Sequence, residues 1–499
     1  MDPIIQKRKA FRTFKELSFF GQQSNQPYYL LPFRFQAINS EREALVNEVG
    51  DLLVVPAGTA GRIVRRQIHA HADGELYGDL LANFFISETV IPPLIDVLAT
   101  RYRTKKSFLD HFTALHIFVI TLRCEHTCHY CQVSRVTQEK EAFDMPQHHI
   151  DQGIELMMQS PNPKVTMEFQ GGEPLLAFEK IVYAVRQARV AAQIHKKEIS
   201  FVICSNLAPL TDGMLTFCHE HNILLSTSLD GPAHLHNANR RRPGHNSYAL
   251  AVEGIQRARQ TLGYERVSAL MTTSTLSLEY PDAIIDEYFD LGFRNIFLRP
   301  ISPYGFAKRH QKKNRYETEA FLTFYKKALT RIIEYNRQGH RFVEDYASII
   351  LRKVLTPFPV GYVDLQSPAG LINNVVLFNY NGKVYASDES RMLAEMQDDA
   401  FCLGHLDTHT YKALFYGQKA TEIAEYWTNE SLPGCSECAF QAYCGADPVF
   451  HHASQGDMAG YRPDSAFCQK NLEIIRYLLE LMDQDKEIAQ IFNTWINHS

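Results

Sequence analysis

The chain has 499 residues, of which 45% are hydrophobic and 21% are charged, and its formal net charge is −5 at pH 7. At about 150 residues per domain, this length predicts roughly three domains and a large buried core. The small negative charge gives no reason to expect nucleic acid or an anionic membrane as a partner.

No apolar run approaches the ~18 residues of a membrane-spanning helix, and Met1–Gln22 lacks the apolar core of a signal peptide. We therefore expect a cytoplasmic protein. In that reducing compartment the ten cysteines are expected to stay unpaired, so clustered cysteines are interpreted as metal ligands.

The first 105 residues contain no chemical motif. Tyr28–Phe35 and Ala44–Val55 are predicted as strands, and Leu76–Phe85 and Pro93–Tyr102 as helices. This pattern indicates a small α+β domain.

From residue 106 to residue 310, predicted strands and helices alternate. The six apolar runs predicted as strands are Leu115–Leu122, Lys164–Phe169, Ile199–Cys204, Leu224–Leu229, Val267–Thr272 and Ile296–Arg299. The helix-length segments between them are Gln147–Gln159, Pro174–Gln193, Asp212–Glu220, Tyr248–Thr261 and Tyr280–Leu291. Such crossovers require a mainly parallel sheet, and six strands are too few for a closed eight-stranded barrel. The prediction is an α/β fold with an open, partial (β/α)6 barrel and an active site at the carboxyl ends of its strands.

Three cysteines follow the first of these strands: Cys124, Cys128 and Cys131, with three and then two residues between them. Four thiolates complete a [4Fe–4S] cluster, so three leave one iron open to a small molecule. Zinc is the alternative, because His126 or His129 could supply a fourth ligand.

The second strand ends in Gly171-Gly172-Glu173-Pro174. Two glycines let the backbone approach a ligand closely, and a glutamate can accept hydrogen bonds from an ammonium group. Taken alone, this segment is also an ordinary turn into a helix. Polar residues stand at three further strand ends, namely Ser205, Ser228 and Arg299.

The C-terminal part begins with a predicted helix over Tyr316–Tyr335 and a predicted hairpin over Asn379–Tyr385. Four more cysteines follow, with two, five and twenty-three residues between them: Cys435, Cys438, Cys444 and Cys468. Four thiolates could complete a cluster with no open iron, or hold a structural zinc ion.

The spacing of Cys124, Cys128 and Cys131, followed by Gly-Gly-Glu one strand later, resembles the signature of the radical S-adenosylmethionine (SAM) enzymes. The later cysteines resemble the SPASM extension of their peptide and protein maturases. The phrases most similar to the maturases of His-Xaa-Ser peptide systems are Cys131-Gln-Val-Ser134, Glu168-Phe-Gln-Gly-Gly-Glu173 and Cys444-Gly-Ala-Asp-Pro448. The resemblance spans about residues 110 to 480.

The resemblance implies a SAM-binding [4Fe–4S] cluster at the first three cysteines, with SAM chelating the open iron. It implies one auxiliary [4Fe–4S] cluster at Cys435, Cys438, Cys444 and Cys468. The residues implied to contact SAM are Tyr130, Gly171, Gly172, Glu173, Ser205, Ser228 and Arg299. The implied reaction is reductive cleavage of SAM to a 5′-deoxyadenosyl radical, which abstracts hydrogen from a peptide or protein side chain.

The chain departs from the family where a second auxiliary cluster would take its ligands. Those places hold Ser367 or Ala369, Ser387 and Pro448, so we expect that cluster to be absent. Asp388 occupies the position of the aspartate that receives the substrate proton in sulfatase-modifying relatives. It is a candidate catalytic base, and the alternative is a surface carboxylate.

We expect four regions: residues 1–105, the barrel at 106–310, a helical connector at 311–360, and a SPASM-like domain with a C-terminal helix at 361–499. In similar peptide-modifying enzymes the N-terminal segment is a winged-helix-like module that captures a leader peptide by strand addition. A structural cap is the alternative.

The expected partners are a ribosomally made precursor peptide or protein, a reducing electron donor such as flavodoxin or ferredoxin, and a second maturase. Two other functions stay open. The chain could be a radical SAM enzyme that acts on a small metabolite, or a non-catalytic zinc-binding adaptor.

Overall fold

A computed structural model describes residues 27–89, 92–131, 133, 135–137, 139–304 and 316–496. Gln132 and Ser134 of the Cys131–Ser134 phrase, the segment Met1–Gln22 and the expected boundary near residue 310 lie outside these ranges. The chain divides into two compact units, one ending at Arg101 and the other beginning at Tyr102. No helix in the described ranges is long and apolar enough to cross a membrane.

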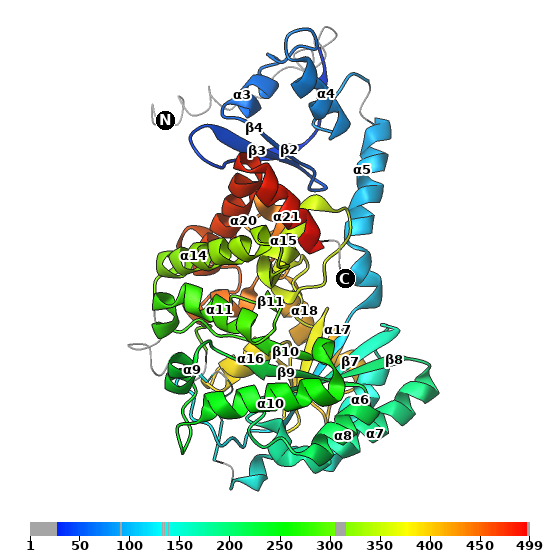
Figure 1. The fold of residues 1–499 in the computed structure, drawn as a ribbon. Coiled ribbons are helices and arrows are strands. Elements are labelled where there is room, and N and C mark those ends of the chain that lie inside the picture. The colour runs from blue at the N-terminus through cyan, green and yellow to red at the C-terminus, as the bar shows by residue number, and fades with distance from the viewer. Residues whose placement is uncertain are drawn as a thin grey trace, which may run out of the picture. The chain divides into compact units, whose positions relative to one another are not determined.

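The first unit contains a three-stranded antiparallel sheet in the order β2-β3-β4 (Figure 1). Its strands and helices are β1 (Tyr29–Leu30), β2 (Phe33–Ala37), β3 (Arg42–Asn47), β4 (Leu52–Pro56), α3 (Thr59–Val64), α4 (Gly74–Ala82) and β5 (Ile86–Ser87). The helix α5 (Pro92–Lys105) continues into the second unit. The buried side chains of Tyr28, Leu45, Ile63 and Leu80 form the core of the first unit.

The single strand predicted over Ala44–Val55 is wrong. The structure has two strands there, β3 and β4, which pair antiparallel across a tight turn. The side-chain oxygen of Asn47 accepts the backbone N–H groups of Val49 and Asp51, and Gly50 adopts a φ of 77°. The turn therefore forms inside a run that looks continuous when only its apolar residues are considered.

The second unit is built on an eight-stranded sheet in the order β10-β9-β8-β7-β6-β13-β14-β15. Its first five strands along the chain are β6 (Leu115–Thr121), β7 (Lys164–Gly171), β8 (Glu198–Ser205), β9 (Ile223–Ser228) and β10 (Val267–Leu270), all parallel. Six of the seven residues of β6 are buried, and five of the seven are apolar, as expected for a strand covered on both faces. All five predicted strands are present.

The predicted crossover helices are also present. They are α6 (Gln147–Met158), α7 (Phe178–His195), α8 (Asp212–Glu220), α10 (Ser247–Leu262) and α11 (Pro281–Asp290), with a short α9 (Ala233–Asn239) before α10. The carboxyl ends of the parallel strands therefore lie at one edge of the sheet, where the polar strand ends were predicted to meet.

The sixth predicted strand, Ile296–Arg299, does not join this ladder. The strand β11 covers only Asn295–Ile296 and pairs with β12 (Val343–Glu344). The N–H of Leu298 donates to the Glu344 carboxylate at 3.1 Å, which draws this segment toward the C-terminal part of the chain. The segment still reaches the sheet edge, because the Thr273 N–H donates to the Arg299 carbonyl at 2.9 Å.

The C-terminal part extends the sheet on the other side of β6. The strand β13 (Val375–Phe378) pairs parallel with β6, and the antiparallel strands β14 (Lys383–Tyr385) and β15 (Cys402–His405) follow. The predicted hairpin over Asn379–Tyr385 is thus confirmed. The remaining helices are α14 (Thr318–Arg337), α15 (Asp345–Leu355), α16 (Asp388–Ala394), α17 (Tyr411–Tyr416), α18 (Gln418–Ala424), α19 (Pro448–Gln455), α20 (Ala466–Gln484) and α21 (Lys486–Ile496).

Candidate functional site

The loop that carries Cys124, Cys128 and Cys131 leaves the carboxyl end of β6. A partly buried ion pair fixes its first turn, with Arg123 Nη2 lying 2.7 Å from the Asp144 carboxylate. The same nitrogen donates to the Leu176 carbonyl at 2.9 Å. The loop therefore begins in a defined position relative to the ends of β6 and β7.

The far side of the loop is held by the segment after β9. The Tyr130 hydroxyl donates to the Asp230 carboxylate, and Arg240 Nε lies 3.4 Å from the other oxygen of that carboxylate. The Thr127 N–H donates to the Arg241 carbonyl at 2.6 Å. Since Asp230 is completely buried, this arrangement is a buried ion pair with a phenol as an additional donor.

The cysteines of the loop lie close enough to affect one another: besides burial, the charge of Cys131 raises the pKa of Cys128, and the charge of Cys128 raises that of Cys124. Burial raises the pKa of Cys128 to about 12, and the nearby charge of Arg240 opposes this. Burial also raises the pKa of Cys124 well above its usual range, with the charges of Glu125 and Cys128 adding to it. Such thiols become thiolates when a metal centre binds them, so the donor set fits three ligands of an iron–sulfur cluster.

The imidazoles in this loop have protein partners. The His126 Nδ1 atom lies 3.0 Å from the Asn206 amide, and the His129 Nε2 atom lies 3.1 Å from the Asn239 side-chain oxygen. The ligand atoms of Cys124, Glu125 and His126 lie within 4.8 Å of one another, so a divalent metal ion is a second possible occupant.

Gly171 and Gly172 pack the end of β7 against the cysteine loop. A Cβ atom on Gly171 would lie 2.0 Å from the Thr121 carbonyl oxygen, and one on Gly172 would lie 2.2 Å from the Arg123 carbonyl oxygen. The two glycines therefore let the end of β7 lie directly against the backbone at the start of the cysteine loop.

Glu173 is completely buried, and it joins the ends of β7 and β8. Its carboxylate accepts the Leu175 N–H at 3.0 Å, the Ser205 hydroxyl at 2.7 Å and the Asn206 N–H at 2.7 Å. Burial raises its pKa to about 8, and the charge of Glu125 adds to the increase. The structure thus brings Glu173 and Ser205 into direct contact beside the cysteine loop.

Arg299 lies in a different environment from Glu173 and Ser205. It lines a cavity of about 490 Å³ and pairs with Glu389 at 3.2 Å. The other ionisable residues of the lining are Tyr304, Tyr316, Tyr346, Tyr362, Asp364, Asp447 and Lys470. Ser228 stands at the end of β9 and does not line this cavity.

Asp388 directly precedes Glu389, which lines the cavity. It is the first residue of α16 and is half-buried. Its charge contributes to the raised pKa values of Glu168 in β7, of Cys204 in β8, and of Glu389; burial is the largest cause for all three. Asp388 is therefore close enough to these three groups for its charge to act on them, although it does not line the cavity itself.

The four later cysteines lie close enough for their charges to affect one another. Burial raises the pKa of Cys468 to about 12, and the charges of Cys444, Cys435 and Cys438 add to this. Cys468 lies in the first turn of α20, and Ser465, the N-cap of that helix, accepts its N–H at 3.1 Å.

Arg462 lies beside these thiols. Its Nε and Nη2 atoms are buried without a hydrogen-bond partner among the described residues, and its charge lowers the pKa of Cys435, which burial raises. The Asn471 amide also lies 3.6 Å from the Cys444 sulfur. Unused donors beside thiolates suit the sulfur atoms of an anionic cluster.

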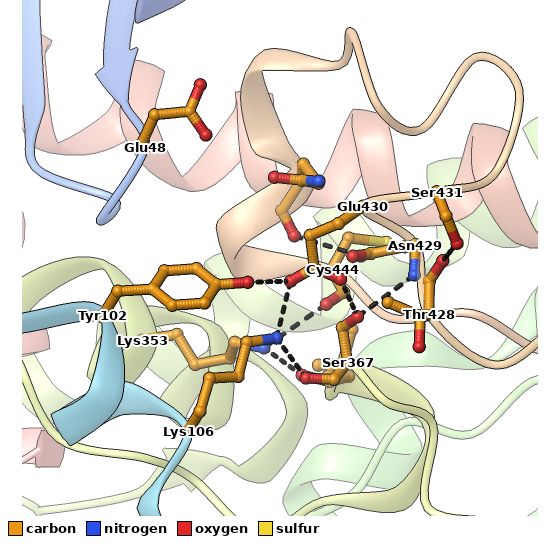
Figure 2. A network of polar contacts seen from close by, with 12 residues as sticks. Glu48, Tyr102, Lys106, Lys353, Ser367, Thr428, Asn429, Glu430, Ser431 and Cys444 are labelled. Carbon is orange, nitrogen blue, oxygen red and sulfur yellow. Dashed lines mark hydrogen bonds and ion pairs between the residues drawn. The ribbon is translucent and has the colours of Figure 1, made fainter. Parts of the chain in front are cut away.

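The positions where family ligands are missing have structural roles instead. Ser387 caps α16 in a reciprocal arrangement with Ser390, and Pro448 is the first residue of α19. Ala369 is completely buried. Figure 2 shows Ser367 in a polar network with Lys106 and Glu430, in which the Asn429 N–H donates to the Ser367 hydroxyl oxygen at 3.1 Å.

This network also anchors the chain before Cys435. Lys106 Nζ lies 2.6 Å from Glu430, and the Tyr102 hydroxyl donates to the same carboxylate at 2.9 Å (Figure 2). Lys353 donates to the carbonyl of Cys444 at 3.4 Å.

Sequence reasoning missed the residues that support the first cysteine loop. Asp230, Asn239 and Arg240 come from one segment more than a hundred residues after Cys124, and Asn206 comes from the end of β8. Asp230 begins an Asp-Gly-Pro segment that resembles one in the family, and Asn206 follows Ser205 at a strand end, but nothing in the sequence connects these residues with the cysteine loop.

Residues 118–298 match the sequence model of the Radical SAM superfamily. The chain carries a radical SAM domain. The serine-type anaerobic sulfatase-maturating enzyme of Bacteroides thetaiotaomicron is 26% identical over 188 residues, which cover 37% of this chain and 44% of that protein.

Two solved structures share the fold. The structure of native anSMEcpe with bound AdoMet has a TM-score of 0.61 and 17% identity, and the match covers 77% of this chain and 99% of that one. The Streptococcus suis SuiB structure bound to precursor peptide SuiA has a TM-score of 0.51 and 11% identity. That match covers 89% of this chain and 100% of the SuiB chain.

These matches confirm the resemblance to radical SAM maturases of the SPASM type. They also confirm the mixed α/β radical SAM fold. The radical SAM domain implies a [4Fe–4S] cluster and SAM as cofactors.

Proposed function

We propose that this radical SAM enzyme modifies a side chain of a ribosomally made precursor peptide or protein. The observation that carries the proposal is that the loop of Cys124, Cys128 and Cys131 lies against Glu173, which accepts the Ser205 hydroxyl, at the carboxyl edge of the parallel sheet. The cluster and SAM, when bound, supply a 5′-deoxyadenosyl radical that abstracts a hydrogen atom from the target carbon.

The chain itself would hold and orient these groups. Cys124, Cys128 and Cys131 would ligate three irons and leave the fourth to SAM. The predicted SAM contacts remain proposals, and the buried positions of Tyr130 and Glu173 support an enclosed site that excludes water.

The cavity at Arg299 would receive the target side chain. Its size suits one side chain and the adjacent peptide backbone, and three carboxylates line it, those of Asp364, Glu389 and Asp447. The Tyr304 hydroxyl is buried there with no hydrogen-bond partner among the described residues.

The lining combines tyrosine rings with charges of both signs, because Arg299 and Lys470 line the cavity beside the carboxylates. Such a lining suits a polar aromatic side chain such as imidazole, and hence a His-Xaa-Ser peptide. Arg299 neutralises Glu389. Asp388, next to that pair, would take the proton released when the substrate radical is oxidised.

A second cluster at Cys435, Cys438, Cys444 and Cys468 would accept the electron from that oxidation. The unused donors of Arg462 support it. A flavodoxin or ferredoxin would deliver the electron that starts each turnover, and a second maturase remains a proposed partner.

Residues 1–105 would dock the leader of the precursor peptide. The strand β2 is an edge of its sheet, and Phe35 on it is 60% exposed. An exposed edge with an apolar side chain suits the addition of a peptide strand.

The test is 5′-deoxyadenosine formation by anaerobically purified, reconstituted and reduced protein in the presence of SAM. Wild-type protein should be brown and should produce 5′-deoxyadenosine, whereas Cys124→Ala should produce none. Cys218→Ala, which removes a buried thiol of α8, is the matched control and should retain the activity. Colourless wild-type protein that contains zinc would contradict the proposal and would support a zinc-binding adaptor.

A further inference from the structure

Two histidines and an aspartate meet on the second unit, in a cluster that has no role in the proposed reaction. His148 and His149 lie in the first turn of α6, and Asp407 follows β15. The Asp407 carboxylate lies 3.8 Å from His148 Nε2 and 3.4 Å from His149 Nε2. The ligand atoms of all three residues lie within 4.8 Å of one another.

These distances resemble those between ligands of one metal ion. Ligands at about 2.1 Å from a tetrahedral zinc ion lie roughly 3.4 Å from one another. His149 is almost completely buried, while the side chains of His148 and Asp407 are 61% and 46% exposed. An ion can therefore enter from solvent and reach a partly buried ligand.

The other ring nitrogen of His149 is held in the way that metal-binding histidines usually require. His149 Nδ1 lies 3.5 Å from the Tyr380 carbonyl oxygen, which leaves Nε2 facing Asp407. A histidine ligand usually donates its second N–H to a carbonyl or carboxylate, which fixes the tautomer and the ring orientation.

His405 supports the aspartate from the other side. Its Nε2 atom lies 2.9 Å from the Asn381 carbonyl oxygen, and its Nδ1 atom accepts the Asp407 N–H at 3.2 Å. Because Nδ1 is already engaged, His405 positions Asp407 in this structure and is not one of the three ligands.

The hairpin turn leaves room for these rings. Gly382 has a φ of 84°, and a Cβ atom there would lie 2.6 Å from both the His149 and the His405 Cε1 atoms. Only glycine suits this conformation and this space, so the turn that joins β13 to β14 permits the two imidazoles to approach it together.

We propose that His148, His149 and Asp407 form a binding site for a divalent transition-metal ion, with zinc as the best fit. Two imidazoles and one carboxylate are ligands that zinc prefers, and water would complete the tetrahedron. Calcium and magnesium prefer sets of oxygen ligands, so they fit less well.

The metal ion would connect elements that are far apart along the chain. Its ligands come from α6, which follows β6, and from the end of the β13–β15 extension. It would therefore hold the C-terminal extension of the sheet against the helix that packs beside the first cysteine strand.

The test uses the full chain with its iron–sulfur sites reconstituted first, so that the cysteines are occupied. Zinc chloride is added in slight excess, unbound metal is removed, and zinc and iron are measured by elemental analysis. We expect about one zinc per chain with iron content unchanged. His149→Ala and Asp407→Asn should weaken zinc binding by at least tenfold, in line with losses of about 10- to 100-fold for removing even outer partners of a metal site.

His195→Ala, an exposed histidine at the end of α7, is the matched control and should bind zinc as wild type does. If His149→Ala fails to fold, Asp407→Asn still tests the site. The iron content of each variant shows whether that variant has folded. Equal zinc uptake by wild type and by a folded Asp407→Asn variant would overturn the proposal. So would zinc uptake that is accompanied by loss of iron, since the zinc would then lie at the cysteines.

Discussion

At the scale of single residues, the cysteine loop depends on a charge pair that sequence reasoning did not connect with it. Arg240 faces a completely buried Asp230, which also accepts the Tyr130 hydroxyl. Removing one partner of a buried pair leaves an unpaired charge, which costs about 3–5 kcal/mol.

Arg240→Gln should therefore lower the thermal unfolding midpoint and reduce the iron bound by the loop. Arg241→Gln is the matched control, because the exposed Arg241 contacts Thr127 through its backbone carbonyl and not its side chain. Equal midpoints and equal iron contents for the two variants would show that the Asp230 pair does not hold the loop.

Glu173 gives the second prediction at this scale. Its carboxyl group accepts three hydrogen bonds at the ends of β7 and β8, and a buried donor left without its partner costs about 1–3 kcal/mol. Glu173→Ala should weaken SAM binding at least tenfold while the visible spectrum of the cluster persists. Glu179→Ala, an exposed change in α7, should leave SAM affinity unchanged. Unaltered SAM affinity in Glu173→Ala would remove Glu173 from the site.

The cysteines and the Gly-Gly-Glu segment could be found from the sequence because each is a contiguous pattern with a chemical meaning. Asn239 and Arg240 could not, because their contact with the loop depends on how α9 turns back toward β6. Single polar residues after a strand have many possible partners until the fold is known.

At the scale of elements, five of the six barrel strands and the crossover helices follow from apolar periodicity. The prediction of a sixth barrel strand was wrong because the Leu298 N–H donates to Glu344, a partner more than forty residues away. The parallel pairing of β13 with β6 was not predicted either, since the two strands are separated by more than 250 residues and the sequence carries no local signal for such pairing.

That pairing places His116 of β6 beside Phe378 of β13, with ring centroids 6.2 Å apart. Burial lowers the pKa of His116 to about 3, so the folded chain keeps it neutral. Below about pH 6.5 the unfolded chain binds a proton there that the folded chain does not, so stability falls as pH falls. The loss is at most about 1.4 kcal/mol per pH unit.

His116→Leu, which keeps a similar volume, should remove that part of the pH dependence. The measurement is the thermal unfolding midpoint at several pH values from 7.5 down to 5. The wild-type midpoint should fall more steeply than that of His116→Leu, and His195→Asn should follow wild type. Parallel curves for wild type and His116→Leu would show that His116 protonates freely in the folded chain.

The edge strand β2 gives a further prediction at this scale. Phe35→Arg should weaken binding of a leader-bearing His-Xaa-Ser precursor while leaving slow SAM cleavage without peptide unchanged, because Phe35 belongs to the other compact unit. Leader affinity can be measured by fluorescence anisotropy of a labelled peptide. Undiminished affinity, with Phe35→Arg correctly folded, would favour the structural-cap interpretation.

At the scale of the whole molecule, we expect the chain to hold two iron–sulfur centres and no third. Seven of the ten cysteines fall into a group of three and a group of four, and the places of the missing ligands are occupied by residues with structural roles. Ser387 caps α16, Ser367 belongs to the network of Lys106 and Glu430, and Pro448 begins α19. Cluster iron is held mainly by thiolates, so these residues cannot replace a ligand set.

The total iron content tests this claim most directly. Reconstituted wild-type protein should hold about eight irons per chain, with Mössbauer spectra excluding adventitious iron. The triple variant Cys124→Ala, Cys128→Ala, Cys131→Ala should keep about four irons, all at Cys435, Cys438, Cys444 and Cys468. A wild-type content near about twelve irons would reveal a third cluster and contradict the account. Complete loss of iron in the triple variant would contradict it as well, because the later cysteines would then hold another metal.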